Sequence, residues 1–119
     1  ILVHSRVENP SNQLRLDLYR CYDITDVSAL GGVHTLDLSY CNKITDVSAL
    51  GKLHNLNLWG CYNIEDISAL GNVHTLCLTS CFKVKDVSAL SKVQNLNLSG
   101  CMNITDLSSL DKVPNLTPP

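Results

Sequence analysis

The 119-residue chain has 9 basic and 11 acidic side chains and a net charge of −2. This length allows one compact unit and is too short for two independent domains. Because no basic run is present to follow a phosphate backbone, nucleic acid is a poor candidate partner, and no apolar stretch approaches the length that spans a membrane.

A period of 20 residues organises the sequence, with equivalent cysteines at positions 21, 41, 61, 81 and 101. A unit this short cannot enclose a hydrophobic core and must stack on near-copies of itself. We therefore predict one solenoid domain over 1–119. We expect an irregular N-terminal cover over 1–13, five repeats over 14–112 and a truncated last turn over 113–119.

The repeat at 33–52 shows the expected elements in chain order. Leu36 and Leu38 alternate with polar residues, which predicts a strand with one buried face. Cys41 then points inward. The apolar residues that follow have a spacing of three, which favours a tight 3₁₀ turn: Ile44, Val47 and Leu50.

Two further residues of this repeat have predicted backbone roles. Asp46 directly precedes the 3₁₀ turn and is placed to cap it by accepting backbone N–H groups. Gly51 closes the repeat, where we expect an unusual backbone angle that glycine tolerates. Stacking the repeats then gives one continuous core and a parallel sheet on one side.

The pattern LxLxxCxxI over residues 36–44 resembles the leucine-rich repeat signature, with Cys where many members carry Asn. The Asp-Val-Ser-Ala-Leu segment that follows is similar to the short convex segment of internalin-like repeats. This resemblance implies a right-handed coil with a parallel β-sheet on the concave side, short 3₁₀ or irregular turns on the convex side, and a role in protein–protein recognition. The near-identity of the copies also resembles multicopy repeat proteins of large DNA viruses of amoebae.

The regular spacing of the cysteines argues against a disulfide scaffold. Stacked turns place equivalent thiols ~4.8 Å apart and parallel, whereas a disulfide requires a specific relative orientation of the Cβ atoms. We predict a reduced, buried ladder, which favours an intracellular, cytoplasmic location. Three matches to the glycosylation pattern point the other way, and they begin at Asn97, Asn103 and Asn115.

The outward strand positions vary between repeats while the apolar positions barely change. They form a polar face, and the aromatic residues gather where the strands end. We predict a non-catalytic binding surface for a protein partner on the strand face and this aromatic edge: Arg15, Asp17, Tyr19, Asp37, Tyr40, Asn57, Trp59, Tyr62, Phe82 and Asn97. Two alternatives remain, a solvated face whose aromatic residues only cover the turns, and a purely structural unit of a larger array.

Three histidines, His34, His54 and His74, form a column that continues as Gln94 and Pro114. Imidazoles ~5 Å apart suit Zn, Cu or Ni, but the site lacks a carboxylate or thiolate at matching height. We therefore expect a hydrogen-bonded ladder and no metal or cofactor.

An enzyme is not predicted, because an aspartate repeated in every turn indicates a cap and catalysis needs one asymmetric constellation. A solenoid also exposes a strand at each end, so end-to-end stacking into a homodimer is possible. The four prolines, at 10, 114, 118 and 119, lie outside the five full repeats and discourage growth of the sheet at its edges.

Overall fold

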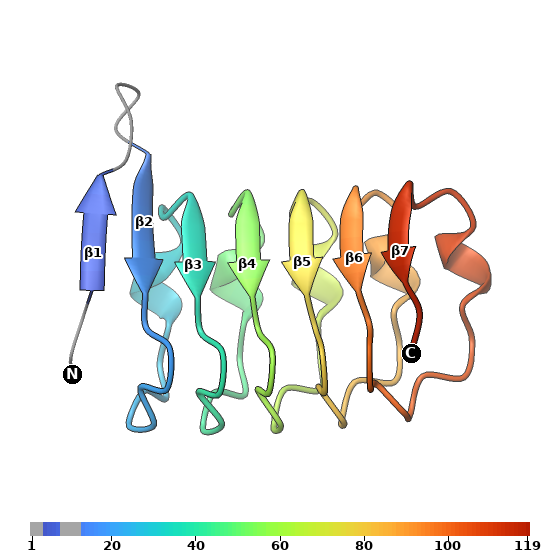
Figure 1. Ribbon diagram of the computed structural model, residues 1–119, viewed down its shortest axis with the longest axis horizontal. Helices are drawn as coiled ribbons and strands as arrows, with labels where there is room; N and C mark the ends of the chain where they lie inside the picture. Colours follow the sequence, from blue (N-terminus) through green and yellow to red (C-terminus); the bar gives the residue numbers. More distant parts are fainter. Residues whose placement is uncertain (1–3, 8–12) are drawn as a thin grey trace.

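In the computed structural model, which describes residues 4–7 and 13–119, each repeat forms one turn of an open coil (Figure 1). A turn contributes one short strand on one side and one 3₁₀ helix on the other. The strands that follow the repeat are β2 (Leu14–Asp17), β3 (Thr35–Asp37), β4 (Asn55–Asn57), β5 (Thr75–Cys77), β6 (Asn95–Asn97) and β7 (Asn115–Thr117). The 3₁₀ helices are η1 (Ser28–Leu30), η2 (Ser48–Leu50), η3 (Ser68–Leu70), η4 (Ser88–Leu90) and η5 (Ser108–Leu110).

The strands form one sheet in which spatial order follows chain order. From β2 to β7 all neighbours are parallel, and each residue pairs with its equivalent in the next repeat, as Leu36 does with Leu56. This constant register places equivalent side chains in columns, so the period of the sequence becomes a period in space. The predicted leucine-rich repeat architecture is confirmed.

The predicted irregular cover over 1–13 contains a strand, β1 (His4–Val7), which pairs antiparallel with β2. The prediction of irregular structure is therefore wrong for residues 4–7, and the rest of the cover up to residue 12 lies outside the described residues. The physical reason is the exposed edge of β2, whose backbone groups need partners that an added strand supplies. The segment lacks the repeat pattern, so periodicity gave no signal for it.

The core consists of stacked columns of Leu, Ile, Val and Cys. In the central turns Leu38, Ile44 and Leu50 are completely excluded from solvent. At the C-terminal end Ile104 and Val113 each keep 8% of their surface exposed, because no sixth full repeat covers them. Among the described residues, none of the helices has the length and apolar character needed to cross a bilayer.

Asp46 was predicted to accept backbone N–H groups at the start of the 3₁₀ turn, and this is confirmed for one N–H group. Ser48 N donates to Asp46 Oδ1 at 2.9 Å, and the same bond recurs in all five repeats. Hydrogen bonding to the side chain and backbone of Ser48 lowers the pKa of the Asp46 carboxyl. The aspartate column is thus explained by backbone hydrogen bonds.

The prediction for Gly51 is wrong, because its φ of −67° is ordinary. Glycine suits a close approach there, since a Cβ at Gly51 would lie 2.4 Å from the Ala69 carbonyl oxygen of the next turn, although Ser91 and Asp111 hold the equivalent position in the last two repeats. The unusual backbone occurs instead at the residue before each cysteine. There φ is positive in every repeat: Arg20 (59°), Tyr40 (63°), Gly60 (73°), Ser80 (60°) and Gly100 (74°).

Candidate functional site

Three aromatic side chains from successive turns meet where the strands end. Tyr19 meets Tyr40 edge-to-face with ring centroids 6.1 Å apart, and Tyr40 meets Trp59 at 5.8 Å in a tilted arrangement. Tyr19 and Trp59 keep 47% and 44% of their surfaces exposed. We call Tyr19, Tyr40 and Trp59 the aromatic group. It joins two repeat positions, since Tyr19 and Trp59 are equivalent residues and Tyr40 stands one position later.

Tyr40 occupies a backbone conformation that suits glycine. Its φ of 63° is left-handed, a region that is unusual for a bulky side chain. Its ring also requires a glycine in the next turn, because a Cβ at Gly60 would lie 2.6 Å from Tyr40 Cδ1. Two residues of the chain are therefore adapted to hold this ring at the edge of the sheet.

Arg20 lies against the aromatic group and was not among the predicted binding residues. Its guanidinium carbon lies 5.0 Å from the Tyr19 ring centroid and 5.6 Å from that of Tyr40, within the range of cation–π attraction. The signal in the sequence is its position before Cys21, a column where two other repeats carry glycine.

Four of the predicted binding residues also shape the backbone. The side-chain Oδ1 of Asp17, Asp37, Asn57 or Asn97 accepts the N–H of the second residue onward, at 2.8–3.0 Å. Ser39, the one buried polar side chain among the described residues, also donates its hydroxyl to Asp37 Oδ1 at 2.5 Å. Aspartate and asparagine accept the same backbone hydrogen bond, so this bond does not require the negative charge of Asp17 and Asp37.

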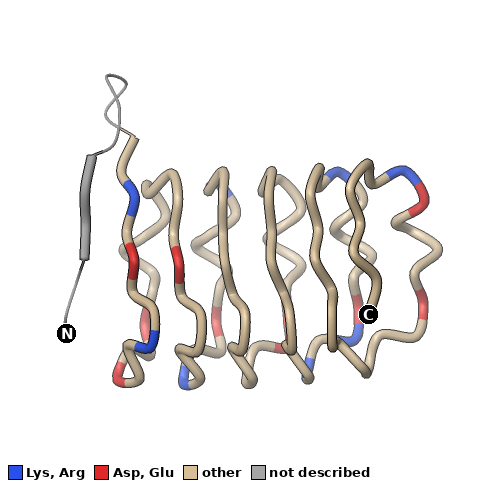
Figure 2. Tube along the Cα trace, in the orientation of Figure 1, with Lys and Arg blue, Asp and Glu red and all other residues tan. Residues whose placement is uncertain are grey.

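Charge on the sheet side is confined to its N-terminal part. Figure 2 shows coloured residues along β2 and β3 and none along β4 to β7. These charged residues are Arg15, Asp17 and Asp37. Charge and aromatic rings therefore coincide over the first three turns.

The rest of the sheet side is a neutral ladder of amides and hydroxyls. Asn55 Nδ2 donates to Thr35 Oγ1 at 3.3 Å, and Asn95 Nδ2 donates to Thr75 Oγ1 at 3.1 Å. Near the C-terminal end a shallow hollow of about 560 Å³ lies over β5 to β7. Many of the polar groups here already form hydrogen bonds with one another. The C-terminal part of the sheet side therefore has fewer polar groups left to bind a partner.

The other predicted aromatic residues form a separate pair. Tyr62 and Phe82 stack with ring planes at 2° and centroids 5.4 Å apart. They share a column with Tyr22 and Met102, which are 50% and 74% exposed. The structure thus divides the aromatic edge into the three-residue aromatic group and this stacked pair.

The histidine column is a stack of parallel imidazoles. Ring centroids are 4.8 Å apart for His34 and His54 and 4.4 Å apart for His54 and His74, with ring planes within 13°. Each Nδ1 lies 2.8–3.1 Å from a side-chain oxygen of the next residue, so these hydrogen bonds stay within a turn and the rings of neighbouring turns are joined by stacking. Parallel rings do not aim their nitrogens at one point, and no group of three metal-ligating side chains is found in the described part of the chain.

The cysteine column is buried from Cys41 onward, and all six cysteines are free thiols. Cys61 Sγ donates to the Leu38 carbonyl of the preceding turn at 3.1 Å, and Cys41, Cys81 and Cys101 make the equivalent bond. Burial raises the pKa of Cys61 to about 12, so the thiol stays protonated and keeps its donor role. The predicted reduced ladder is confirmed as geometry, and the intracellular location derived from it stays a prediction.

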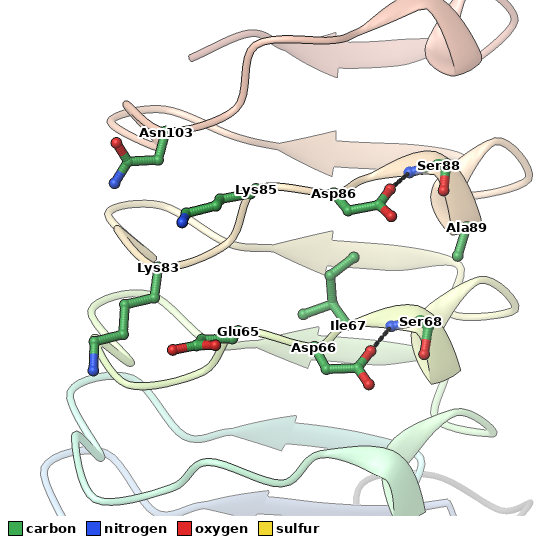
Figure 3. Close-up of a pocket in the computed structure, with 10 residues that line it drawn as sticks. All are labelled: Glu65, Asp66, Ile67, Ser68, Lys83, Lys85, Asp86, Ser88, Ala89 and Asn103. Carbon is green, nitrogen blue, oxygen red and sulfur yellow. Dashed lines mark hydrogen bonds between the residues drawn. The ribbon is translucent and has the colours of Figure 1, made fainter.

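A groove of about 770 Å³ on the opposite side, shown in Figure 3, was not predicted. Glu65, Lys83 and Lys85 line it together with the capping carboxylates of Asp66 and Asp86. Each of these two carboxylates accepts a backbone N–H 2.9 Å away, from Ser68 and Ser88 respectively. The groove is therefore lined by side chains of both charges, and its Asp66 and Asp86 carboxylates already accept hydrogen bonds from the backbone.

Comparison with solved structures agrees with the repeat geometry. The internalin inlF of Listeria monocytogenes is similar over 87% of this chain and 33% of its own, with 30% identity and a TM-score of 0.62. Internalin C2 of the same species gives 28% identity over 78% of this chain and 54% of its own, with a TM-score of 0.41. The functional domain of InlJ of that species, which includes a cysteine ladder, gives 18% identity over 76% and 31%, with a TM-score of 0.34.

This chain therefore has a leucine-rich repeat fold similar to that of internalins and spans about a third of the length of inlF. No family model matches the sequence, and no curated protein sequence matches it. The expected resemblance to repeat proteins of amoebal viruses is not supported.

Proposed function

We propose that the chain is a non-catalytic scaffold that binds a protein partner through the N-terminal part of its sheet side. The contact surface consists of the aromatic group and the charged residues around it: Arg15, Asp17, Tyr19, Arg20, Asp37, Tyr40 and Trp59. The observation that carries the proposal is the meeting of three rings from successive turns, with Tyr19 and Trp59 exposed on either side of Tyr40. Exposed aromatic side chains grouped in this way are typical of contact surfaces.

The repeats themselves show that the fold does not require the aromatic group. Gly60 and Gly100 stand where Tyr40 does, and Ser39 and Ser99 stand where Trp59 does. Trp, Tyr and Arg are also the residue types that dominate the binding energy of protein interfaces. Exposed Tyr19 and Trp59 around Tyr40 thus fit an anchor for a partner better than a cover for the turn.

The remaining predicted residues belong to a secondary part of the proposed surface. Asn57 and Asn97 lie on the same sheet face, and the stacked Tyr62 and Phe82 extend the contact along the turn that follows each cysteine. Rim contacts of this kind contribute less to affinity than a central aromatic anchor. We therefore expect substitutions here to weaken binding less than substitutions in the aromatic group.

The test is affinity capture from an extract of the source organism with three forms of the chain. The double variant Tyr40→Gly/Trp59→Ser introduces residues that other repeats carry at these positions, which keeps the fold. Asn95→Thr is the control, because Thr35 and Thr75 occupy that column. We expect a partner that binds the wild type and the control, and whose Kd rises at least about 30-fold for the double variant.

A partner that binds all three forms equally contradicts the proposed surface. Circular dichroism and the urea midpoint of each form show whether the solenoid is intact. With the fold intact, a higher Kd for the double variant measures how much the Tyr40 and Trp59 rings contribute to partner binding.

The rival function is a structural unit of a larger array, favoured by the near-identity of the repeats and by the edge of β7, which pairs only with β6 among the described strands. Sedimentation distinguishes the two functions. An array unit self-associates as concentration rises, and this association is unaffected by Tyr40→Gly/Trp59→Ser.

A further inference from the structure

Asp17 and Asp37 carry charge that the fold does not use. Their Oδ1 atoms accept the N–H groups of Tyr19 and Ser39 at 3.0 and 2.8 Å. Asn57 does the same for Trp59 at 3.0 Å with a neutral amide. The negative charge is therefore an addition to the turn, and in this column it occurs only in the two repeats that contribute Tyr19 and Tyr40.

The sheet brings the two carboxylates together. Asp17 pairs with Asp37 in the parallel register, which places neighbouring strands about 4.8 Å apart. Like charges at this separation repel one another, and no ion pair joins either carboxylate to another described side chain. Arg15 lies two residues before Asp17 on the same face, whereas Thr35 holds the equivalent place beside Asp37. Arg15 and Arg20 equal the two carboxylates in number, so the surface has no net charge, and Asp37 is the carboxylate whose strand neighbour, Thr35, is neutral.

These rings already attract a cation. The Arg20 guanidinium lies over Tyr19 and Tyr40, and Trp59 has no described cation over it. Trp is the strongest of the aromatic side chains in cation–π attraction. Tyr40 N donates to Trp59 O at 2.7 Å, so Ser39, bonded to Asp37, lies in the turn beside Trp59. An exposed indole and the Asp37 carboxylate thus stand in adjacent turns.

We infer that the contact surface takes a partner segment that presents a lysine or arginine side chain to Trp59 and to the carboxylates of Asp17 and Asp37. This inference rests on the proposed function and adds the chemistry of the partner. The ring supplies apolar contact and cation–π attraction, and the carboxylate pair supplies the counter-charge. Charge of this kind governs specificity and the association rate more than total affinity.

The experiment selects ligands from a random-peptide display library on the immobilised full chain. Synthetic versions of the selected peptides are then titrated calorimetrically into the wild type, Asp17→Asn/Asp37→Asn and Trp59→Ser. Asparagine retains the backbone acceptor, as Asn57 does, so the first variant removes charge alone. We expect enrichment of Lys or Arg at one position of the peptides, and a Kd at least about tenfold higher for the charge variant.

Raising NaCl from about 50 to about 500 mM is expected to weaken the wild-type complex more than that of the charge variant. Peptides that depend on Trp59 but show no basic residue, or bind the charge variant equally, overturn this inference and leave the proposed function standing. Peptides that bind the wild type, the charge variant and Trp59→Ser equally overturn the inference and the proposed surface together.

Discussion

Tyr40 packs against Gly60 of the next turn, and its large ring fits there because Gly60 has no side chain. The Tyr40 ring fills the space that a Cβ at Gly60 would occupy, and both residues have positive φ. Elsewhere in this column the contact is looser, since a Cβ at Gly100 would lie 3.1 Å from Ser80 Oγ. The single residue is thus the scale at which the proposed contact surface differs from the repeated scaffold.

Gly60→Ala is expected to destabilise the fold by about 1–3 kcal/mol, because the added methyl group meets the Tyr40 ring at a positive φ. In the Tyr40→Gly background the steric part of this cost disappears, and only the cost of the φ angle remains. Urea denaturation of the four forms gives the coupling energy. Equal losses in both backgrounds would show that the ring does not press on Gly60.

Cys77 interrupts the column of Asp and Asn acceptors that forms the last residue of strands β2, β3, β4 and β6. Its thiol lies 3.2 Å from Thr79 Oγ1, and no acceptor for the Thr79 N–H is found among the described residues. Cys77→Asn restores the acceptor that Asn57 and Asn97 provide, so we expect a gain of about 0.5–1.5 kcal/mol in unfolding free energy. Cys77→Ala serves as the control, and an equal gain there would contradict a role for the hydrogen bond.

Ladders of equivalent side chains are the elements that join one turn to the next. The cysteine ladder bonds each thiol to a carbonyl of the preceding turn, and the histidine ladder stacks three rings over adjacent strands. Both ladders contain groups that titrate. Burial shifts the pKa of one member of each ladder, upward for the Cys61 thiol and downward for the His34 imidazole.

The buried thiols predict loss of stability at alkaline pH. The pKa of Cys61 is raised to about 12, whereas the unfolded thiol titrates near pH ~8.5. Stability is full below the unfolded pKa and falls as pH rises toward the folded pKa, because only the unfolded chain releases the proton. For one such site the loss is about 2 kcal/mol at pH ~10.

Cys61→Ser retains a donor to Leu38 O but does not titrate in this range. Its unfolding free energy, measured in urea with a reductant, is expected to fall less steeply than that of the wild type between pH ~8 and ~10.5. Parallel curves for the two proteins would show that Cys61 is not the source of the alkaline loss.

The histidine ladder predicts a loss of stability at mildly acidic pH. Burial first, then the charges of His54 and Arg15, lowers the pKa of His34. The unfolded imidazole therefore binds its proton first, and the stability present above the unfolded pKa of about 6.5 declines as pH falls through the folded pKa. His34→Gln copies the Gln94 found in the same column. We expect a shallower decline between pH ~7.5 and ~5 in this variant, and an unchanged slope would contradict the prediction.

In the whole molecule, stability comes from contacts between neighbouring turns, so the two ends differ from the middle. The N-terminal edge of β2 is paired with β1, whereas among the described strands β7 pairs only with β6. Burial separates both ends from the middle: Leu58 and Leu70 are fully excluded, whereas Leu16 and Leu30 near one end and Leu107 and Leu116 near the other are only partly buried.

Hydrogen exchange is expected to be slowest for the amides of β4 and β5 and faster for those of β6 and β7. The reason is that a central turn can open only by losing two neighbours, whereas the C-terminal turn loses one. Exchange measured on the full chain by mass spectrometry or NMR tests this order. Uniform protection, with no concentration dependence in sedimentation, would contradict both the fraying and the proposed end-to-end dimer.

The repeat, the inward cysteines and the backbone role of Asp46 could be predicted from the sequence alone. The reason is that all turns share one period and one register, so equivalent residues have the same environment in every turn. Five copies of the pattern therefore indicate the same environment for each position. The predicted strand face and histidine ladder follow from the same periodicity. For the proposed contact surface, the sequence indicated the region of exposed aromatic side chains.

Features that join different columns, or that lie outside the repeat, could not be predicted without the three-dimensional arrangement of the turns. The aromatic group joins Tyr19, Tyr40 and Trp59 from two repeat positions, so no single column contains it. A glycine at position 51 is compatible either with a positive φ or with a close approach of the backbone. The short distance to the Ala69 carbonyl shows that the second applies. The strand β1 has no copy elsewhere in the chain, and its pairing depends on the free edge of β2. Periodicity specifies what every turn shares, whereas contacts between unlike side chains of neighbouring turns depend on packing in three dimensions.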